Sequence, residues 1–112
     1  MTEHRDDVVL VVSTWPDEKA ASAVARELVL DRLAACVQVL PGVLSTYRWK
    51  GRLETATEVR MEAKTTPGRL LELQRRLAER HPYEVPEILV LPVVDGLPAY
   101  VHWVRAETFH AP

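Results

Sequence analysis

His81 and Cys36 are the side chains of this chain that are best suited to binding a metal ion. His81 follows a helical pattern and precedes Pro82, where its imidazole could ligate a metal or make a pH-sensitive contact between subunits. At the end of a helix it could equally serve the helix dipole, and one histidine alone does not make a metal site. Cys36 is a soft donor for copper, but its alanine and valine neighbours favour a small buried side chain. A structural role is therefore favoured for both residues.

Positive side chains offer a second kind of site, one for an anion. Lys64 lies just before the sequence Thr-Thr-Pro, which should open a helix, and together with that helix N-terminus it could hold a carboxylate. Such a lysine more often belongs to a solvated or ion-paired strand face, here shared with Glu58, Arg60 and Glu62. Arginines also recur along the expected helix, but glutamates interrupt them, which predicts a solvated helix face. These arginines are Arg69, Arg76 and Arg80.

No arrangement of residues typical of an enzyme is present. The chain has no G-x-S-x-G, H-E-x-x-H or C-x-x-C motif, and its four glycines are scattered singly, so there is no glycine-rich phosphate loop. Glu84 and Glu87 form a carboxylate pair, but their spacing assigns no acid and base roles. Their segment is expected to position the entry to the last strand instead. The sequence therefore predicts a protein that is not an enzyme.

Size and composition narrow the class of protein further. With 112 residues, 12.7 kDa and 47% hydrophobic residues, the chain should form one domain over residues 1–112, with terminal tails at about 1–7 and 109–112. A net charge of -2 argues against a nucleic-acid-binding protein. No apolar run reaches about 20 residues, so no membrane span is expected. The N-terminus lacks the order of a signal peptide and there is one cysteine, which predicts a cytoplasmic location.

The first half of the chain shows a strand, a helix and a long hairpin. Residues 8–14 form a β-branched run typical of a buried strand. Pro16 should then open a helix, whose apolar positions recur from Ala21 to Leu33. Residues 36–49 form a second strand with an expected kink at Pro41-Gly42, because a proline removes a donor from the ladder. Lys50-Gly51 should reverse the chain into a third strand that alternates clearly as far as residue 65.

The second half repeats a helix and a strand. Pro67 should begin a second helix, which His81-Pro82 ends. Residues 88–94 read as another buried strand, and Pro92 indicates a sheet edge. Pro98 should open a short last helix. The order strand, helix, strand, strand, helix, strand, with a C-terminal helix added, predicts an α+β fold: the split βαβ sandwich of ferredoxin-like domains.

Two features predict that a single copy is not sufficient. The strands at 8–14 and 88–94 are apolar at both odd and even positions, whereas two helices cover only one face of a four-stranded sheet. The hairpin arms on either side of Gly51 run about 13 residues each, or roughly 40 Å, which exceeds the diameter of a domain of this size. Tyr47 and Trp49 near the overhanging tip are large aromatics that suit an interface. The pattern predicts an oligomer but does not supply the number of copies.

Five short stretches of the chain occur in a recognisable order. They are LAACV ahead of a Pro-Gly pair, Y-x-W-x-G at the hairpin tip, KTT before the second helix, HPYEVPEILVLPV, and the terminal YVHWV. Together with the whole run from Ser13 to Gly51, they resemble the CutA divalent-cation-tolerance family, and the resemblance covers nearly the whole chain, from about Val8 to Thr108. The resemblance implies a ferredoxin-like fold and a tightly packed homotrimer. It also implies cytoplasmic divalent-metal tolerance or binding, notably of copper, rather than catalysis.

The resemblance implies a copper ligand set that this chain keeps only in part. Copper-binding relatives have a cysteine just before T-x-P-D-E, where this chain has Ser13, and a double histidine before Pro-Tyr, where it has Arg80-His81. A serine hydroxyl is a much poorer copper ligand than a thiolate. Copper or another divalent metal should therefore bind more weakly here than in relatives with the full set. The candidate ligand-binding residues of the clefts between subunits are Cys36, Lys64 and Tyr83.

A PII-like signalling trimer is the alternative function. It shares the general architecture and binds a nucleotide or a small anion in clefts between subunits, so Lys64 and Arg60 would matter more than His81. A small ferredoxin-like enzyme such as an acylphosphatase needs a loop with a paired arginine and asparagine, and this chain contains no asparagine. The expected partner is a further copy of the chain, with no nucleic acid and no membrane.

Overall fold

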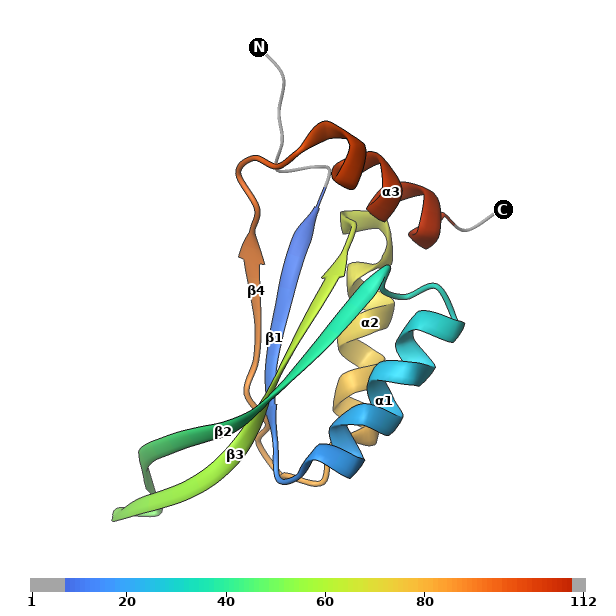
Figure 1. Ribbon diagram of the computed structural model, residues 1–112. Coiled ribbons are helices and arrows are strands. Elements are labelled where there is room, and N and C mark those ends of the chain that lie inside the picture. Colours follow the sequence, from blue (N-terminus) through green and yellow to red (C-terminus); the bar gives the residue numbers. More distant parts are fainter. Residues whose placement is uncertain (1–7, 110–112) are drawn as a thin grey trace.

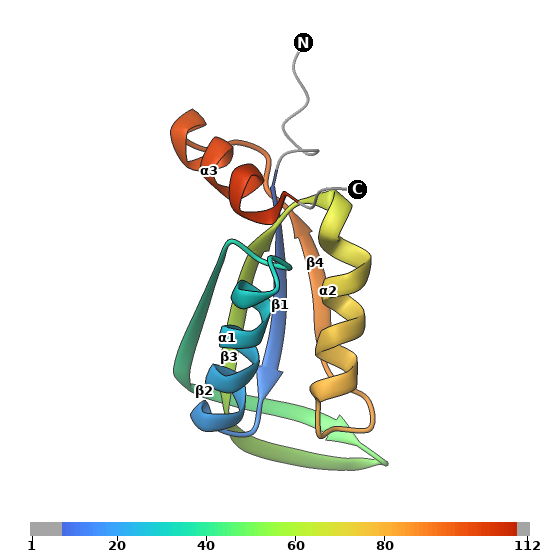
Figure 2. The ribbon, with the colours of Figure 1, turned by 90° about the vertical axis from the view of Figure 1, so that its right-hand side faces the viewer.

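One antiparallel sheet with helices on one face forms the framework of the computed structural model, which describes residues 8–109 (Figure 1). The elements are β1 (Val9–Trp15), α1 (Glu18–Leu30), β2 (Cys36–Trp49), β3 (Arg52–Thr65), α2 (Pro67–Arg80), β4 (Ile88–Pro92) and α3 (Pro98–Thr108). The strands lie in the order β2-β3-β1-β4. Figure 2 shows α1 and α2 side by side in front of the sheet, with α3 across one end. The predicted ferredoxin-like α+β fold is confirmed. The tail expected at about 1–7, and all but the first residue of the tail expected at about 109–112, lie outside the described residues.

The core lies between the sheet and the two covering helices. Alternate residues of β1 and β3 face this side, because successive strand residues point to opposite faces. α1 and α2 each add an apolar stripe at spacings of three and four residues. The largest fully buried side chains here are Trp15, Leu28, Leu33, Met61, Leu73 and Leu77. Each such side chain contributes roughly 1.5–3 kcal/mol relative to an exposed one, so this layer fixes where the loops and the hairpin begin.

Helix α1 begins two residues later than the sequence predicted. Asp17 is its N-cap, and the carboxylate accepts a hydrogen bond of 2.8 Å from a backbone N–H of the first turn. Pro16 therefore lies outside the helix. The Asp17 carboxylate can accept a hydrogen bond from a free N–H group of the first turn, and a proline side chain has no acceptor for it. The helix also ends at Leu30 rather than Leu33, since Arg32 adopts the left-handed φ of 57° that is typical after a helix end.

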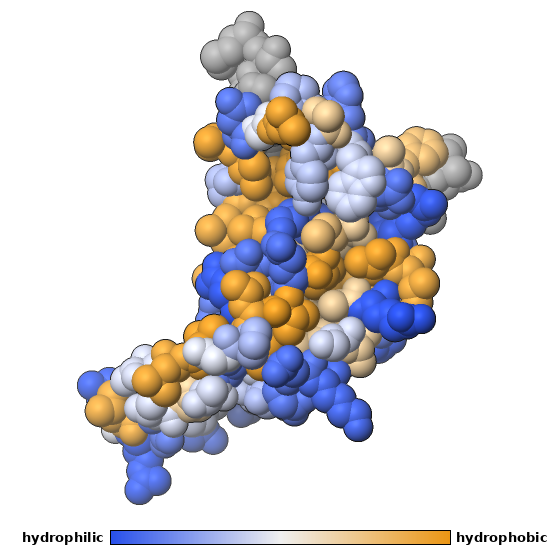
Figure 3. All heavy atoms as spheres, in the orientation of Figure 1, coloured by the Kyte–Doolittle hydropathy of each residue, from blue (hydrophilic) through white to orange (hydrophobic). Residues whose placement is uncertain are grey.

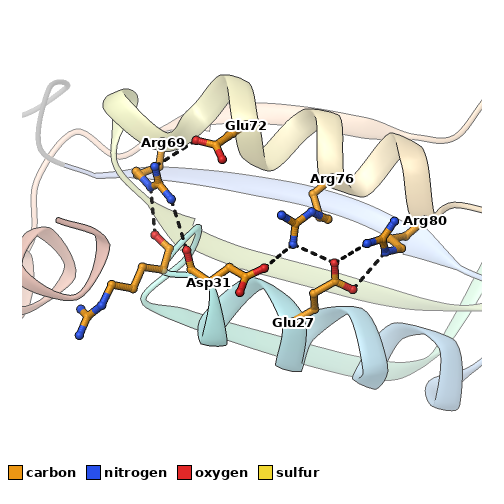
Figure 4. A network of polar contacts seen from close by, with 7 residues as sticks. Glu27, Asp31, Arg69, Glu72, Arg76 and Arg80 are labelled. Atoms are coloured by element: carbon orange, nitrogen blue, oxygen red, sulfur yellow. Dashed lines mark hydrogen bonds and ion pairs between the residues drawn. The ribbon is translucent and has the colours of Figure 1, made fainter. Parts of the chain in front are cut away.

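The arginines of α2 do not form the solvated face that the sequence predicted (Figure 4). Arg69 is buried and donates to two backbone carbonyls at the end of α1. Arg76 forms ion pairs with Glu27 at 2.8 Å and Asp31 at 2.7 Å, and Arg80 pairs with Glu27 at 2.9 Å. The hydrogen bond from Arg80 is the main cause that lowers the pKa of Glu27. The prediction was wrong for Arg69 and Arg76, because their partners come from the α1 side, far away in the sequence, whereas Arg80 is half exposed.

The long hairpin of β2 and β3 is confirmed. Its pairing register shifts between Leu40 and Val43, at the predicted Pro41-Gly42 kink, where the glycine has a left-handed φ of 78°. Lys50 and Gly51 reverse the chain with φ values of 50° and 77°. Past the kink the ribbon runs beyond the body of the domain, which gives a longest dimension of 47 Å against 29 and 22 Å (Figure 1). The predicted overhang is therefore present.

The sheet face opposite α1 and α2, called the open face below, is only partly covered. Leu89 and Leu91 of the edge strand β4 are 56% and 40% exposed on it, and Leu40 of β2 is 40% exposed. β3 instead presents Arg60 and Glu62, whose side chains pair at 2.9 Å. Figure 3 shows apolar surface along the β4 side and on the hairpin. The open face is thus apolar along its β4 edge and charged along β3.

Candidate functional site

A groove of about 680 Å³ lies where the hairpin bends away from the domain. The hairpin supplies one wall, and the segment between α2 and β4 supplies the other. Its lining residues are Thr14, Ser45, Thr46, Tyr47, Trp49, Glu58, Tyr83, Glu84, Val85 and Glu87. They include three aromatic rings and three carboxylates, but neither a lysine nor an arginine. The groove is therefore both aromatic and acidic.

His81 fastens one wall of this groove to β1. It is the C-cap of α2 and is 9% exposed. Its Nδ1 accepts a hydrogen bond of 3.1 Å from the Tyr83 backbone N–H, and its Nε2 lies 2.6 Å from the Thr14 carbonyl oxygen. Because Nδ1 is an acceptor, Nε2 carries the ring proton and donates to Thr14. The ring also packs against Trp15 and Tyr83, with centroids 4.2 and 4.7 Å away.

Tyr83 continues the contact from His81 to β3. Its hydroxyl donates a hydrogen bond of 3.0 Å to the carboxylate of Glu58, which is 8% exposed. Burial, and after it this hydrogen bond, raises the pKa of Tyr83 to about 12, so the phenol keeps its proton and stays a donor at neutral pH. The sequence placed Glu58 on a solvated strand face, and this was wrong because Tyr83, 25 residues later, covers it.

The residues at the family's copper positions do not form a metal site here. Ser13 is fully buried, and its Oγ accepts a hydrogen bond of 2.8 Å from Trp15 Nε1. Arg80 is paired with Glu27, and both ring nitrogens of His81 have partners. Within residues 8–109, no three histidine, cysteine or acidic side chains gather so that they could hold an ion. The residues present do not fit copper in their observed contacts, and His81 as a ligand stays a prediction.

Cys36 and Lys64 lie at the other end of the sheet from Tyr83. They are direct partners in the β2–β3 ladder, and Cys36 is half-buried rather than fully buried. Tyr100 of α3 lies beside the thiol; burial, and after it Cys36, raises the pKa of this phenol. Lys64 is six residues along β3 from Glu58, or about 20 Å. The structure therefore brings two of the three cleft candidates together and leaves Tyr83 apart. Their binding roles stay predictions.

The acidic residues of the groove were named from the sequence but were not placed in one site. Glu84 and Glu87 read only as the entry to the last strand, and Tyr47 and Trp49 only as interface candidates. All four line one groove. The tyrosine and two glutamates within HPYEVPE were the local signal, but the contact of this segment with the hairpin depends on the sheet order.

A comparison with known proteins now places the chain. A family model described as CutA1 divalent ion tolerance protein matches residues 9–107. The chain belongs to this CutA1 family. The divalent-cation tolerance protein CutA of Thermus thermophilus is 42% identical over 103 residues, which cover 92% of this chain and 98% of that protein. Mouse protein CutA is 45% identical over 95 residues, which cover 85% of this chain and 54% of the mouse protein.

Solved CutA structures share the fold. CutA from Xylella fastidiosa superimposes with a TM-score of 0.89 at 44% identity, covering 92% of this chain and 99% of that one. CutA from Archaeoglobus fulgidus, described as a periplasmic divalent cation tolerance protein, gives 0.88 at 29% identity, with 91% and 99% covered. None of the helices found between residues 8 and 109 has the length and apolar character needed to cross a membrane.

Proposed function

We propose that this CutA1 family member acts as a cytoplasmic homotrimer in divalent metal ion tolerance, without catalytic activity. The observation that carries the proposal is the open face, with Leu40, Leu89 and Leu91 exposed on it. Burying apolar surface contributes roughly 25 cal/mol per Å², and an exposed apolar patch such as the one along β4 usually marks an interface. The lone free cysteine, Cys36, is in keeping with a reducing compartment.

The two free edges of the sheet support a ring-shaped assembly. β2 and β4 are the outer strands, so each leaves one row of backbone groups without a partner strand in the sheet. An interface that joins the β2 side of one copy to the β4 side of the next is head-to-tail, and such an interface forms a ring when the rotation between copies closes. The family resemblance supplies the number three.

Copper is the metal that the resemblance implies, and direct binding would involve His81. A copper ion on either ring nitrogen has to displace Thr14 or Tyr83, which both contact His81. We therefore expect weak binding in a calorimetric titration with Cu²⁺. Heat that falls in His81→Ala but not in His102→Ala, an exposed histidine of α3, supports coordination by His81. Equal heats in all three proteins contradict it.

The alternative of a nucleotide- or anion-binding signalling trimer fits this chain less well. The groove presents three carboxylates and no cation to a ligand. Arg60 and Lys64, the cations that this alternative needs, contact Glu62 and Gln38 instead.

Growth of cells that lack their own copy of this protein tests the proposal. In medium with elevated copper, the unchanged chain should restore growth. The double variant Leu89→Lys and Leu91→Lys should not, because it places charges on the face that assembly covers. Leu71→Lys is the matched control, since Leu71 is 63% exposed on α2, away from that face. Failure of the unchanged chain to restore growth contradicts the role in tolerance, and rescue by the double variant contradicts the need for assembly.

A further inference from the structure

We propose that the groove at the bend of the hairpin binds a small organic cation, one that carries guanidinium or primary ammonium groups. This inference deepens the proposed function and rests on it, since the groove opens at the end of the open face and its ligand would lie in a cleft beside a neighbouring copy. The class of ligand follows from the side chains that line the groove.

The groove side chains stand on one side of the sheet. Thr14 and Glu58 lie on the open face, because their strand neighbours at odd spacing point into the core. Past the kink, Val43 pairs with Glu58, and Tyr47 and Trp49 follow Val43 at even spacing. Both aromatics therefore face the same side as the Glu58 carboxylate. The bend of the ribbon thus turns a flat strand surface into a concave wall.

No basic side chain within residues 8–109 forms an ion pair with the carboxylates of the groove. Glu58 is almost fully buried, and its carboxylate is held in place by the Tyr83 hydroxyl at 3.0 Å. Glu84 and Glu87 are exposed at the rim, and neither has a hydrogen bond or an ion pair within the described part of the chain. His81 anchors the segment that carries these groups. A cation that enters the groove would therefore meet one carboxylate that is held in place, that of Glu58, and two at the rim that have no ion pair within the described residues.

The aromatic rings select an organic cation over a metal ion or an anion. Tyr47, Trp49 and Tyr83 are 38–43% exposed, and aromatic faces attract ammonium and guanidinium groups. Lys50 Nζ already lies 5.8 Å from the centroid of the Trp49 ring, so the rings of Tyr47 and Tyr83 are the ones without a cation of the chain. An anion is repelled by the three carboxylates, and the described residues offer no set of three ligands for a metal ion. A volume of about 680 Å³ suits a small molecule. Carboxylates at the base and at the rim favour a ligand with two cationic ends.

Agmatine, which has a guanidinium at one end and an ammonium at the other, is the probe. Calorimetry on the full chain, with the mass of the same sample measured by sedimentation, should show saturable binding. Glu58→Gln keeps an acceptor for Tyr83 but removes the charge, so we expect affinity to fall about tenfold. Glu62→Gln is the matched control on the same strand and face, outside the groove, and should bind as the unchanged chain does. 4-Guanidinobutyrate, with a carboxylate in place of the ammonium, should bind more weakly than agmatine.

Three results would overturn the inference. The first is a trimer that does not bind agmatine. The second is equal affinity for agmatine in the Glu58→Gln and Glu62→Gln variants. The third is agmatine binding that appears only in the double variant Arg48→Ala and Arg52→Ala. The last result would mean that hairpin arginines of a neighbouring copy already fill the groove. A sample that sediments as a monomer and still binds agmatine supports the cation site and contradicts only the proposed trimer.

Discussion

A chain of hydrogen bonds from Thr14 through His81 and Tyr83 to Glu58 shapes the candidate site. It joins the segment after α2 to β1 and to β3, two strands that are themselves neighbours in the sheet. Each hydrogen bond uses a polar group that would otherwise lie partly buried without a partner, and such a group lowers the stability of the fold. His81 therefore has a structural task in this protein that any role as a metal ligand would interrupt.

The link between Tyr83 and Glu58 should give the protein a distinctive pH dependence. The pKa of Tyr83 is raised to about 12 from its ordinary value of 10.0. A raised pKa means that the protonated phenol stabilises the folded state. This contribution to the free energy of unfolding is fully present below pH 10 and is lost as the pH rises to about 12. Tyr83→Phe should lower the free energy of unfolding by about 1 kcal/mol at neutral pH. Urea unfolding from pH 8 to 12 measures this, and a difference from the unchanged chain that persists undiminished at the alkaline end contradicts the assignment.

Residue types were visible in the sequence, but their partners were not. His81 and Tyr83 stood out in HPYEVPE, and both help to build the groove. Glu58 was assigned to a solvated face because strand alternation shows which side a residue takes and not what covers that side. Its cover comes from a segment 25 residues away. The same limit applies to the arginines of α2, whose partners lie on α1.

At the level of helices and strands, the apolar periodicity predicted the type and order of every element in residues 8–109. The hairpin, its kink at Pro41-Gly42 and its reversal at Lys50-Gly51 were also predicted, because proline and glycine leave few conformations open to the backbone. The ends of α1 were not. Capping by Asp17 and the turn at Arg32 are settled by hydrogen bonds and backbone angles that periodicity does not register.

The kink should depend on the glycine at position 42. Its φ of 78° lies in the left-handed region, so Gly42→Ala should cost roughly 1–2 kcal/mol even though nothing lies within 4 Å of the added methyl group. Gly68→Ala is the matched control: its position is equally open but lies in the first turn of α2 with no left-handed φ. Alanine there should be neutral or stabilising by up to about 1 kcal/mol. Thermal or urea unfolding compares the two, and equal losses would contradict the strain argument.

The overhanging ribbon ties the hairpin to the behaviour of the whole molecule. Trp49 is 41% exposed near the hairpin tip, and such a ring suits burial against a second copy. Trp49→Ala should therefore weaken assembly, seen as dissociation at a higher protein concentration by sedimentation, while helix content by circular dichroism stays the same. Trp103→Ala, with 42% exposure on α3, is the matched control. Unchanged assembly in Trp49→Ala would contradict an interface role for the tip.

Mass in solution tests most directly whether the open face and the protruding hairpin are covered by further copies. Sedimentation equilibrium of the full chain should give about 38 kDa, three times the chain mass of 12.7 kDa. The midpoint of thermal unfolding should also rise with protein concentration, because assembly stabilises the folded state by mass action. A species of 12.7 kDa that remains soluble at high concentration would contradict the account.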